Sequence, residues 1–346
     1  MIIAVDASGG DYAPYEVVKG AIKAAHEYKV KIALVGKKNI LHVLAGRYLD
    51  QLDMTIVDAS QVIEPHESPT QAVQSKPDSS IVVGINLLKS GAASAFVSAG
   101  RSGAVAIASL LYLGMIEGVP RPAIGSFINI TPATPALLID AGANTECRPE
   151  HLLWFAYLGS LYVSQILGIS SPRVGLLNNG EEETKGNKLT KETHQLLKNS
   201  PLNFIGNIEG HDILKGKADV IVTDGFTGNI MLKTIEGISD NWLYSLTQAG
   251  HLFSKAHSLP AKVLHRDMGM ESWAKKLDYS EYGGACLLGL NGNVIIAHGR
   301  SKAKAIKNAI ALAMKTAEGD VAGIIRKEIA SQSSSIFENS PIRTKP

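Results

Sequence analysis

The segment Thr223-Asp224-Gly225-Phe226-Thr227-Gly228-Asn229-Ile230 follows Ala218–Val222, an apolar run that is rich in β-branched residues and predicts a buried strand. The next residues, Met231–Glu236, have helical spacing. The polar segment therefore lies in a strand-to-helix turn, where open α/β sheets bind their ligands. Glycines in such a turn let backbone N–H groups approach an anion, and a helix N-terminus favours negative charge.

Strand-like runs recur along the chain, and helical patterns lie between many of them. The predicted strands are Ile2–Val5, Lys31–Val35, Met54–Val57, Ala95–Ser98, Ala123–Ile128, Pro135–Ile139, Arg173–Leu177, Val220–Thr223 and Asn293–Ala297. The predicted helices are Tyr15–Tyr28, Ser79–Ser90, Gly103–Leu113, Pro149–Leu167, Thr190–Ser200 and Ala303–Glu318. This alternation predicts an α/β fold with a largely parallel sheet and helices on both faces.

Residues 1–330 contain no stretch that reads as a linker, so we predict a single two-lobed domain. The polar, serine-rich residues 331–346 predict a disordered tail. Trp242–Trp273 differs from the rest, because it is rich in aromatic residues and methionine. This stretch is either core or dimer interface, or a surface that docks on a bilayer.

The composition excludes several classes of protein. The 346-residue chain has 45% apolar and 19% charged residues, an ordinary composition for a globular protein. Its net charge of +2 is too small to create an electrostatic field that would recruit nucleic acid. The two cysteines, Cys147 and Cys286, lie far apart, which argues against a disulfide scaffold or structural zinc and favours a reducing cytosol. The first residues have the pattern of a strand, so we expect no signal peptide. No apolar run reaches the roughly 18–20 residues of a membrane span, so we expect a cytoplasmic protein.

Glycine-rich, polar segments follow strand-like runs at six places. These segments are Asp6–Asp11, Ser98–Ala104, Asp140–Asn144, Asn178–Asn187, Gly206–Gly210 and Asp224–Asn229. Any one of them is ordinary, because α/β loops use glycine, asparagine and aspartate anyway. Because most of the six follow the carboxyl ends of strands, they predict one shared cleft.

A small tetrahedral anion such as phosphate suits the second of these segments. Ser98, Ser102 and the backbone amides can donate to it, whereas Arg101 either supplies a cation or pairs with a carboxylate elsewhere. Lys185 is either an anion-binding cation or a solvated loop lysine. The neighbouring Glu181–Glu183 run is either solvated or serves to orient Lys185 or bind a cation.

Several familiar chemistries lack their motifs. The chain has no G-x-x-x-x-G-K-[ST], G-x-G-x-x-G, G-x-S-x-G or H-E-x-x-H sequence, which disfavours a P-loop kinase, an ordinary Rossmann dehydrogenase, a serine hydrolase and a zincin. Among the histidines, His211 lies in a candidate loop, whereas His66 and His298 are interpreted as structural.

Ten segments together, from Ile3 to about Met314, resemble the phosphate acyltransferase family of bacterial phospholipid synthesis, the acyl-acyl-carrier-protein:phosphate acyltransferases. The segments that carry the resemblance are Asp6–Pro14, Ser98–Gly100, Gly118–Ala123, Asp140–Asn144, Leu176–Asn178, Gly180–Glu182, Lys185–Asn187, Gly206–Gly210, Thr223–Asn229 with Leu232–Thr234, and Gly283–Ala285. The resemblance implies a Rossmann-like α/β/α sandwich related to the isocitrate and isopropylmalate dehydrogenases and to phosphotransacetylases.

The resemblance also implies a reaction: a long-chain acyl group moves from acyl-carrier protein to inorganic phosphate and gives acyl phosphate. It implies a homodimer that visits the anionic surface of the cell membrane and hands its product to a membrane acyl-phosphate:glycerol-3-phosphate acyltransferase. No metal and no bound cofactor are implied, since phosphopantetheine arrives on the carrier protein. Phosphate is already an anionic nucleophile, so no acyl-enzyme intermediate is required.

The resemblance and the glycine-rich turns together suggest roles for individual residues. Lys185 is implied as the phosphate and transition-state cation, and Asn229 as the oxyanion donor. The predicted phosphate cradle consists of Ser98, Gly100, Arg101, Ser102, Gly103, Gly225, Thr227 and Gly228. Further candidates for the site are Asp6, Gly9, Gly10, Asn144, Asn178, Glu182, Asn207, His211 and Asp224.

The chain departs from the family at a few positions. The family usually has methionine at Ser8, Asn-Thr at Arg101-Ser102, isoleucine at Asn179, arginine at His211 and proline at Cys286. Two other classes of protein stay open: a phosphotransacetylase or decarboxylating dehydrogenase of the same fold, and a non-catalytic binding protein at the membrane. We also expect an acidic carrier protein to bind a basic patch near the cleft, with candidates Lys262, Arg266, Lys275 and Lys276.

Overall fold

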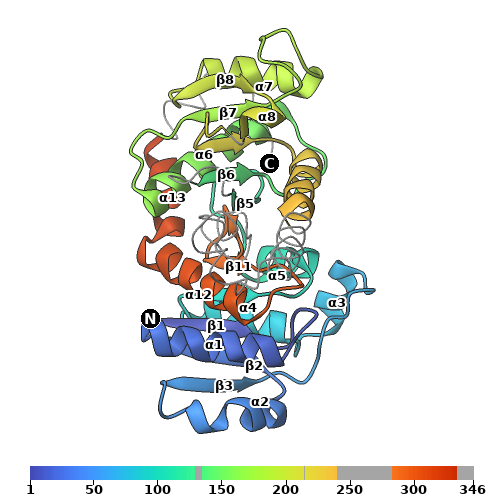
Figure 1. The fold of residues 1–346 in the computed structure, drawn as a ribbon, viewed down its shortest axis with the longest axis vertical. Coiled ribbons are helices and arrows are strands. Elements are labelled where there is room, and N and C mark those ends of the chain that lie inside the picture. The colour runs from blue at the N-terminus through green and yellow to red at the C-terminus, as the bar shows by residue number, and fades with distance from the viewer. Residues whose placement is uncertain (129–134, 214, 240–282, 333–346) are drawn as a thin grey trace, which may run out of the picture.

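The computed structural model describes residues 1–128, 135–213, 215–239 and 283–332 (Figure 1). The described strands are β1 (Ile2–Asp6), β2 (Lys31–Gly36), β3 (Met54–Asp58), β4 (Ala95–Ser98), β5 (Ala123–Ile128), β6 (Ala136–Ile139), β7 (Val174–Leu177), β8 (Phe204–Ile208), β9 (Val220–Val222), β10 (Ala285–Leu288) and β11 (Val294–Ile296). They form one sheet of 11 strands in the order β3-β2-β1-β4-β11-β10-β5-β6-β9-β7-β8.

Helices separate most of these strands along the chain. They are α1 (Tyr15–Tyr28), α2 (Lys38–Ala45), the 3₁₀ turn η1 (Gly46–Tyr48), α3 (Pro69–Ser75), α4 (Ser80–Lys89), α5 (Ser102–Tyr112), α6 (Pro149–Leu167), α7 (Lys188–Lys198), α8 (Gly210–Ile213), α12 (Ala303–Glu318) and α13 (Val321–Gln332). A further helix covers residues 225–239. Among the described residues, no helix has the combined length and apolar character needed to cross a membrane.

The sheet consists of two parallel halves joined by an antiparallel centre. Strands β3, β2, β1, β4 and β11 are parallel to one another, and so are β6, β9, β7 and β8. Between the halves, β10 is antiparallel to both β11 and β5, and β5 is antiparallel to β6. The sheet is therefore mixed but largely parallel, as predicted, since seven of its ten strand pairings are parallel. The two halves occupy opposite ends of the long axis (Figure 1).

Two apolar cores lie on the two faces of this sheet. Successive strand residues alternate between them, so that Ile3 and Val5 of β1 belong to one core and Ala4 belongs to the other. The first core is covered mainly by α1, α2, α6, α12 and α13, and the second mainly by α4 and α5. Helices therefore cover both faces, as the alternation of elements predicted.

The local predictions match the structure closely. All nine predicted strands are present within one or two residues of their predicted ends, and the same holds for the six predicted helices. The sequence did not predict β8, β10, α2, η1, α3, α8 or α13. Residues 206–208 of the predicted turn lie inside β8, and residues 331–332 of the predicted tail are the last two residues of α13. Residues 333–346 and Trp242–Trp273 lie outside the described residues.

Candidate functional site

A cavity of about 610 Å³ lies between the two halves of the sheet. The loops after β1, β4 and β11 line it from one half, and the loop after β6 and the helix 225–239 line it from the other. Residues of β5 and β10 complete the wall. Its volume is within the range of about 300–1,000 Å³ that is usual for small-molecule sites. The cavity is therefore the candidate active site.

A buried aspartate organises the loops of the first half. Asp6 ends β1, and its carboxylate accepts hydrogen bonds from Ser98 Oγ (2.6 Å) and from Ser8 N (3.1 Å). Ser98 Oγ in turn accepts from Gly100 N at 3.0 Å. A Cβ atom at Gly9 would lie 2.3 Å from Asp6 Oδ2, so the close approach of the two loops requires glycine there. Complete burial raises the pKa of Asp6, and the hydrogen bonds to its carboxylate oppose that rise.

A second buried aspartate has the same role in the other half. Asp140 follows β6, and its carboxylate accepts hydrogen bonds from the backbone N–H groups of Ile124, Gly142, Ala143 and Asn144 at 2.7–3.1 Å. The side-chain amide of Asn144 donates a fifth, at 2.7 Å. Burial raises the pKa of Asp140, and these donors oppose the shift. Residues 140–144 and strand β5 are thereby held together.

The loop after β9 packs directly on this aspartate loop. Gly225 N donates to Asn144 O at 2.8 Å. A Cβ atom at Gly228 would lie 1.9 Å from Asp140 O, so no other residue type fits at that position without a shift of the backbone. Asp224 caps the helix 225–239, because its carboxylate accepts from the N–H groups of residues 226 and 227. These contacts fix where the helix begins and therefore where Asn229 lies.

One face of that helix lines the cavity. Asn229, Leu232, Lys233 and Glu236 are all cavity residues, and their spacing of three and four places them on one side of a helix. Lys233 is exposed, whereas Glu236 is buried. The cavity thus receives an amide, an apolar side chain, a cation and a carboxylate from a single helix, which is drawn in yellow-orange in Figure 1.

Arg101, a predicted member of the phosphate cradle, has hydrogen-bond partners on a neighbouring loop. It lines the cavity beside Gly100 and Ser102, at the N-terminus of α5. Its Nη1 nitrogen, however, donates to two backbone carbonyl oxygens, Pro65 O at 2.7 Å and Glu67 O. The guanidinium therefore holds the wall loop, which we define as residues 62–67. It pairs with these carbonyl oxygens rather than with a carboxylate.

Lys76 ties down the same wall loop from the other side. Its Nζ atom donates to Val62 O at 2.7 Å and to the Glu67 carboxylate at 2.6 Å. The hydrogen bond from Lys76 lowers the pKa of Glu67, and so does one from the backbone N–H of Glu64. Two cations therefore hold a loop whose residues 62–65 line the cavity.

His298 is a cavity residue that was interpreted as structural. It follows β11, so the rule that selected the other loops, a polar segment at the carboxyl end of a strand, would have selected it too. Its Nε2 atom lies 3.6 Å from Glu236 Oε2 of the opposite half. Ser301, farther along the same loop, also lines the cavity, and its hydroxyl is buried without a hydrogen-bond partner among the described residues.

The loops after β7 and β8 are outside the described cavity lining. Asn178 donates to Lys185 O at 3.1 Å, and Asn207 donates to Glu182 O at 2.9 Å, so the two loops are joined. The Asn207 side chain also contacts buried His194 at 2.9 Å. Lys185 is exposed. Strand β7 is the parallel neighbour of β9, however, so the loop after β7 leaves the sheet beside the turn that leads into the helix of Asn229.

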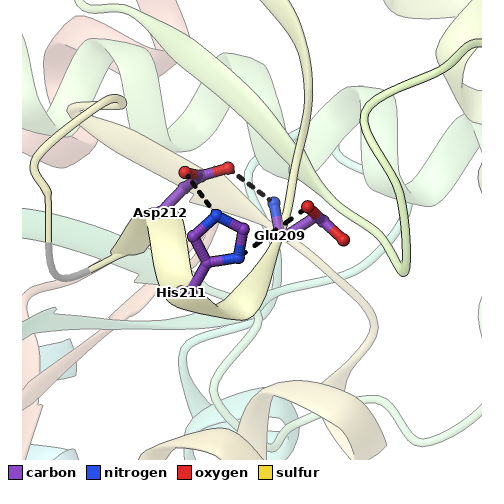
Figure 2. Close-up of side chains that lie close together, drawn as sticks. All are labelled: Glu209, His211 and Asp212. Atoms are coloured by element: carbon purple, nitrogen blue, oxygen red, sulfur yellow. Dashed lines mark hydrogen bonds and ion pairs between the residues drawn. The ribbon is translucent and has the colours of Figure 1, made fainter.

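Figure 2 shows the surroundings of His211. Its ring lies between the carboxylates of Glu209 (3.7 Å) and Asp212 (3.2 Å), in an arrangement that could hold a metal ion. Asp212 Oδ1 also lies 3.2 Å from Lys215 Nζ and 2.8 Å from Lys217 Nζ. These ammonium groups lower the pKa of Asp212, and they already balance its charge. The cluster is best described as an ion-pair network at the end of β8.

The structure therefore divides the candidate residues into three groups. Those that line the cavity are Asp6, Gly9, Gly10, Gly100, Arg101, Ser102 and Asn229. Those that lie in the adjoining loops or helix ends without being part of the lining are Ser98, Gly103, Asn144, Asp224, Gly225, Thr227 and Gly228. The third group, away from the lining, lies in the loop after β7, in β8 and in α8, and consists of Asn178, Glu182, Lys185, Asn207 and His211.

Comparison with known proteins shows the family. Residues 1–323 match the family described as "Fatty acid synthesis protein". A phosphate acyltransferase of Dehalococcoides mccartyi is 56% identical over 341 residues, which cover 99% of this chain and 98% of the relative. A phosphate acyltransferase of Dictyoglomus turgidum is 49% identical over 323 residues, 93% of this chain and 95% of the relative. The chain belongs to this family of phosphate acyltransferases, and the resemblance seen in the sequence is confirmed.

Solved structures show a similar fold. A phosphotransacetylase from Streptococcus pyogenes superimposes with a TM-score of 0.59 at 17% identity, over 93% of this chain and 94% of that protein. A branched-chain phosphotransacylase from Enterococcus faecalis superimposes with a TM-score of 0.57 at 15% identity, over 92% of this chain and 99% of that protein. At these identities the likeness shows the fold alone.

We predict that Asp140→Asn lowers the free energy of unfolding by about 3 kcal/mol, because an amide NH2 group cannot accept the N–H groups that meet the carboxylate. Urea denaturation measures the effect. Asp58→Asn is the matched control, because the exposed Asp58 carboxylate accepts a hydrogen bond from Lys38 N at the surface, and this substitution should change stability by less than about 1 kcal/mol. Equal unfolding midpoints for Asp140→Asn and the wild-type protein would contradict the prediction.

We predict that Arg101→Ala loosens the wall loop and leaves the affinity for phosphate within about threefold of wild type. The variant loses two hydrogen bonds from a charged donor, which together stabilise the loop by about 1.5 kcal/mol or more. Amide exchange in residues 62–67 should therefore become about tenfold faster. Hydrogen exchange with mass spectrometry and the KM for phosphate measure the two effects. A tenfold rise in that KM without faster exchange would show that Arg101 binds phosphate.

Proposed function

We propose that the protein transfers a long-chain acyl group from acyl-carrier protein to inorganic phosphate, forming acyl phosphate for phospholipid synthesis. Membership of the phosphate acyltransferase family over nearly the whole chain supports this function. The observation that carries it in the structure is the cavity between the halves, which is lined by glycine loops and a helix N-terminus that suit an anion. Its volume leaves room beside phosphate for a thioester.

The chemistry requires two reactants to meet and an oxyanion to be stabilised. A phosphate oxygen attacks the thioester carbonyl carbon, the C–S bond breaks, and the thiol of the carrier protein leaves. We propose Asn229 as the donor to the carbonyl oxygen, because its helix face lines the cavity. The glycine loops after β1 and β4 and the N-terminus of α5 supply the phosphate cradle, with Ser102 at the first helical position.

We propose Lys185 as the cation that offsets the charge developing on the transition state. It is exposed, in a loop next to the one that carries Asn229, and it therefore lies at a position that a large carrier-bound substrate can reach. Exposed Lys233, on the helix face that lines the cavity, is a second cation close to the same place.

The proposed function is tested by mixing the purified protein with phosphate and either palmitoyl-acyl-carrier protein or acetyl-coenzyme A. Acyl phosphate, trapped as its hydroxamate, should form from the carrier-protein thioester. Formation only from acetyl-coenzyme A would favour the phosphotransacetylase alternative, for which the shared fold is the sole argument. Formation from neither would favour a binding protein without catalytic activity.

We predict that Lys185→Ala and Asn229→Ala each lower turnover by about a hundredfold, the usual effect of losing one oxyanion-stabilising group. Initial rates of acyl phosphate formation measure this, with circular dichroism to establish that each variant is folded. Lys191→Ala and Asn86→Ala are matched controls on exposed helix positions and should keep normal rates. The mechanism is wrong if both site variants remain near wild-type turnover.

We propose further that the reaction needs no metal and no resident cofactor. The described group with metal-ligand character, Glu209, His211 and Asp212, lies away from the cavity lining, and lysines already pair with its buried carboxylate. Dialysis against EDTA should leave the rate unchanged, and restoration of a lost rate by a divalent ion would contradict this.

The proposal also covers the oligomeric state of the protein and its location in the cell. We propose a cytoplasmic homodimer whose product passes to a membrane acyl-phosphate:glycerol-3-phosphate acyltransferase at the anionic membrane surface. The apolar nature of a long-chain acyl phosphate supports this, since it is poorly suited to release into water. Kinship with the isocitrate and isopropylmalate dehydrogenases is likewise proposed, and two parallel half-sheets around one cavity support it.

We predict that the protein floats with anionic liposomes and that Leu252→Glu with Phe253→Glu abolishes flotation, because the acidic pair would oppose insertion of an apolar surface. Sucrose-gradient flotation measures this, with neutral liposomes as the control. If the wild-type protein stays at the bottom of the gradient, the membrane contact is wrong. If the double variant floats as well as wild type, the contact lies elsewhere.

A further inference from the structure

The cavity has few cations for a site that is proposed to receive inorganic phosphate. Among the lining residues that the structure describes, the lysine and arginine side chains are those of Lys233 and Arg101. Four lining residues carry carboxyl groups, and these are Asp6, Asp11, Glu64 and Glu236. Because ionised carboxylates repel an anion that enters, phosphate binding depends on a lining cation that can turn toward the ligand.

The guanidinium group of Arg101 already has partners in the protein. Its Nη1 nitrogen donates to the backbone carbonyl oxygens of Pro65, at 2.7 Å, and of Glu67. Lys76 holds the same wall loop through Val62 O and the Glu67 carboxylate. The wall loop therefore sets the position of the guanidinium, which makes Arg101 a poor candidate for the main phosphate ligand.

The ammonium group of Lys233 is in the opposite situation. Within the described part of the chain, Lys233 makes no side-chain hydrogen bond, ion pair or ring contact. Its side chain is exposed and lines the cavity. An ammonium group has three N–H donors and no acceptor, so it meets phosphate oxygens without giving up a contact to any described residue.

The helix 225–239 places this cation beside the proposed oxyanion donor. Lys233 follows Asn229 by four residues, so the two side chains are neighbours on the face that lines the cavity, with Cβ atoms about 5–6 Å apart. The other half of the sheet contributes Gly100 and Ser102, at the start of α5. A phosphate ion between Lys233 and these residues lies next to the thioester carbonyl that Asn229 is proposed to bind.

We propose that Lys233 is the residue that binds inorganic phosphate in the cavity, through N–H groups of its ammonium that donate to phosphate oxygens. Lys185, which the resemblance implies as the phosphate cation, lies outside the described lining and keeps the role on the transition state. The two lysines thereby divide the charge between ground-state binding and turnover. This assignment rests on the proposed function, because it takes the bound anion to be the acyl acceptor.

This division of roles gives the two lysines different kinetic signatures. Lys233 contacts phosphate both before and during its attack on the thioester, so its loss should raise the KM for phosphate at least about tenfold and lower kcat by less than about fivefold. Lys185 acts on the transition state, so its loss should lower kcat and leave the KM for phosphate within about threefold of wild type.

The direct test is calorimetric titration with inorganic phosphate in the absence of an acyl donor. The variants are Lys233→Met, which keeps the length of the side chain without its charge, Lys233→Arg, which keeps the charge, and Lys185→Ala. Lys191→Met, on an exposed position of α7, is the matched control. We expect the Kd for phosphate to rise at least about tenfold in Lys233→Met and to stay within about threefold of wild type in the other three variants.

Thermal unfolding separates a binding role from a structural one. Because Lys233 is exposed and has no partner among the described residues, Lys233→Met should change Tm by less than about 2 °C. Wild-type phosphate affinity in Lys233→Met overturns the proposal, as does an equal loss of affinity in Lys185→Ala or the lack of phosphate binding by the wild-type protein. A failure to form acyl phosphate from the carrier-protein thioester, with these affinities as expected, would overturn the proposed function alone.

Discussion

The buried carboxylate of Asp140 is the interaction on which the rest of the site depends. It accepts hydrogen bonds from five N–H groups, and it thereby fixes the loop after β6 against β5. The loop after β9 packs on the same aspartate loop through Gly225 and Gly228. The position of the helix that carries Asn229 and Glu236 therefore depends on Asp140 as well. Asp6 has the equivalent role in the other half, through Ser98 and Ser8.

The antiparallel centre of the sheet joins two parallel halves whose loops line one cavity. Three antiparallel pairings in succession, β11 with β10, β10 with β5 and β5 with β6, connect the halves. Residues of β5 and β10 form the wall between the two loop sets. The proposed reaction between two negatively charged substrates suits this arrangement, because one half carries the proposed anion cradle and the other carries the helix face with Asn229 and Lys233.

Arg101 illustrates how a cation beside the cavity can have a structural role. A guanidinium beside a proposed anion cradle suggests a phosphate ligand. Instead, the guanidinium reaches carbonyl oxygens of the wall loop, which Lys76 holds as well. Backbone carbonyl oxygens are suitable partners for its N–H fork, and the contact leaves the cradle to backbone amides and hydroxyl groups.

The sequence by itself determined the class of fold, nine of the strands, six of the helices, and the loops that bear Asp6, Gly100, Asp140 and Asn229, because periodicity and strand-to-helix turns are local properties. It did not reveal β8, where Gly206 and Asn207 interrupt the apolar pattern, or β10, which is a run of only four apolar residues flanked by glycines. Nor did it reveal the antiparallel pairing of β10, which depends on distant strands. Only the tertiary structure placed His298 against Glu236, turned Arg101 toward the wall loop and left Lys185 outside the cavity lining. Each of these depends on contacts between residues far apart in the chain, which no local pattern encodes.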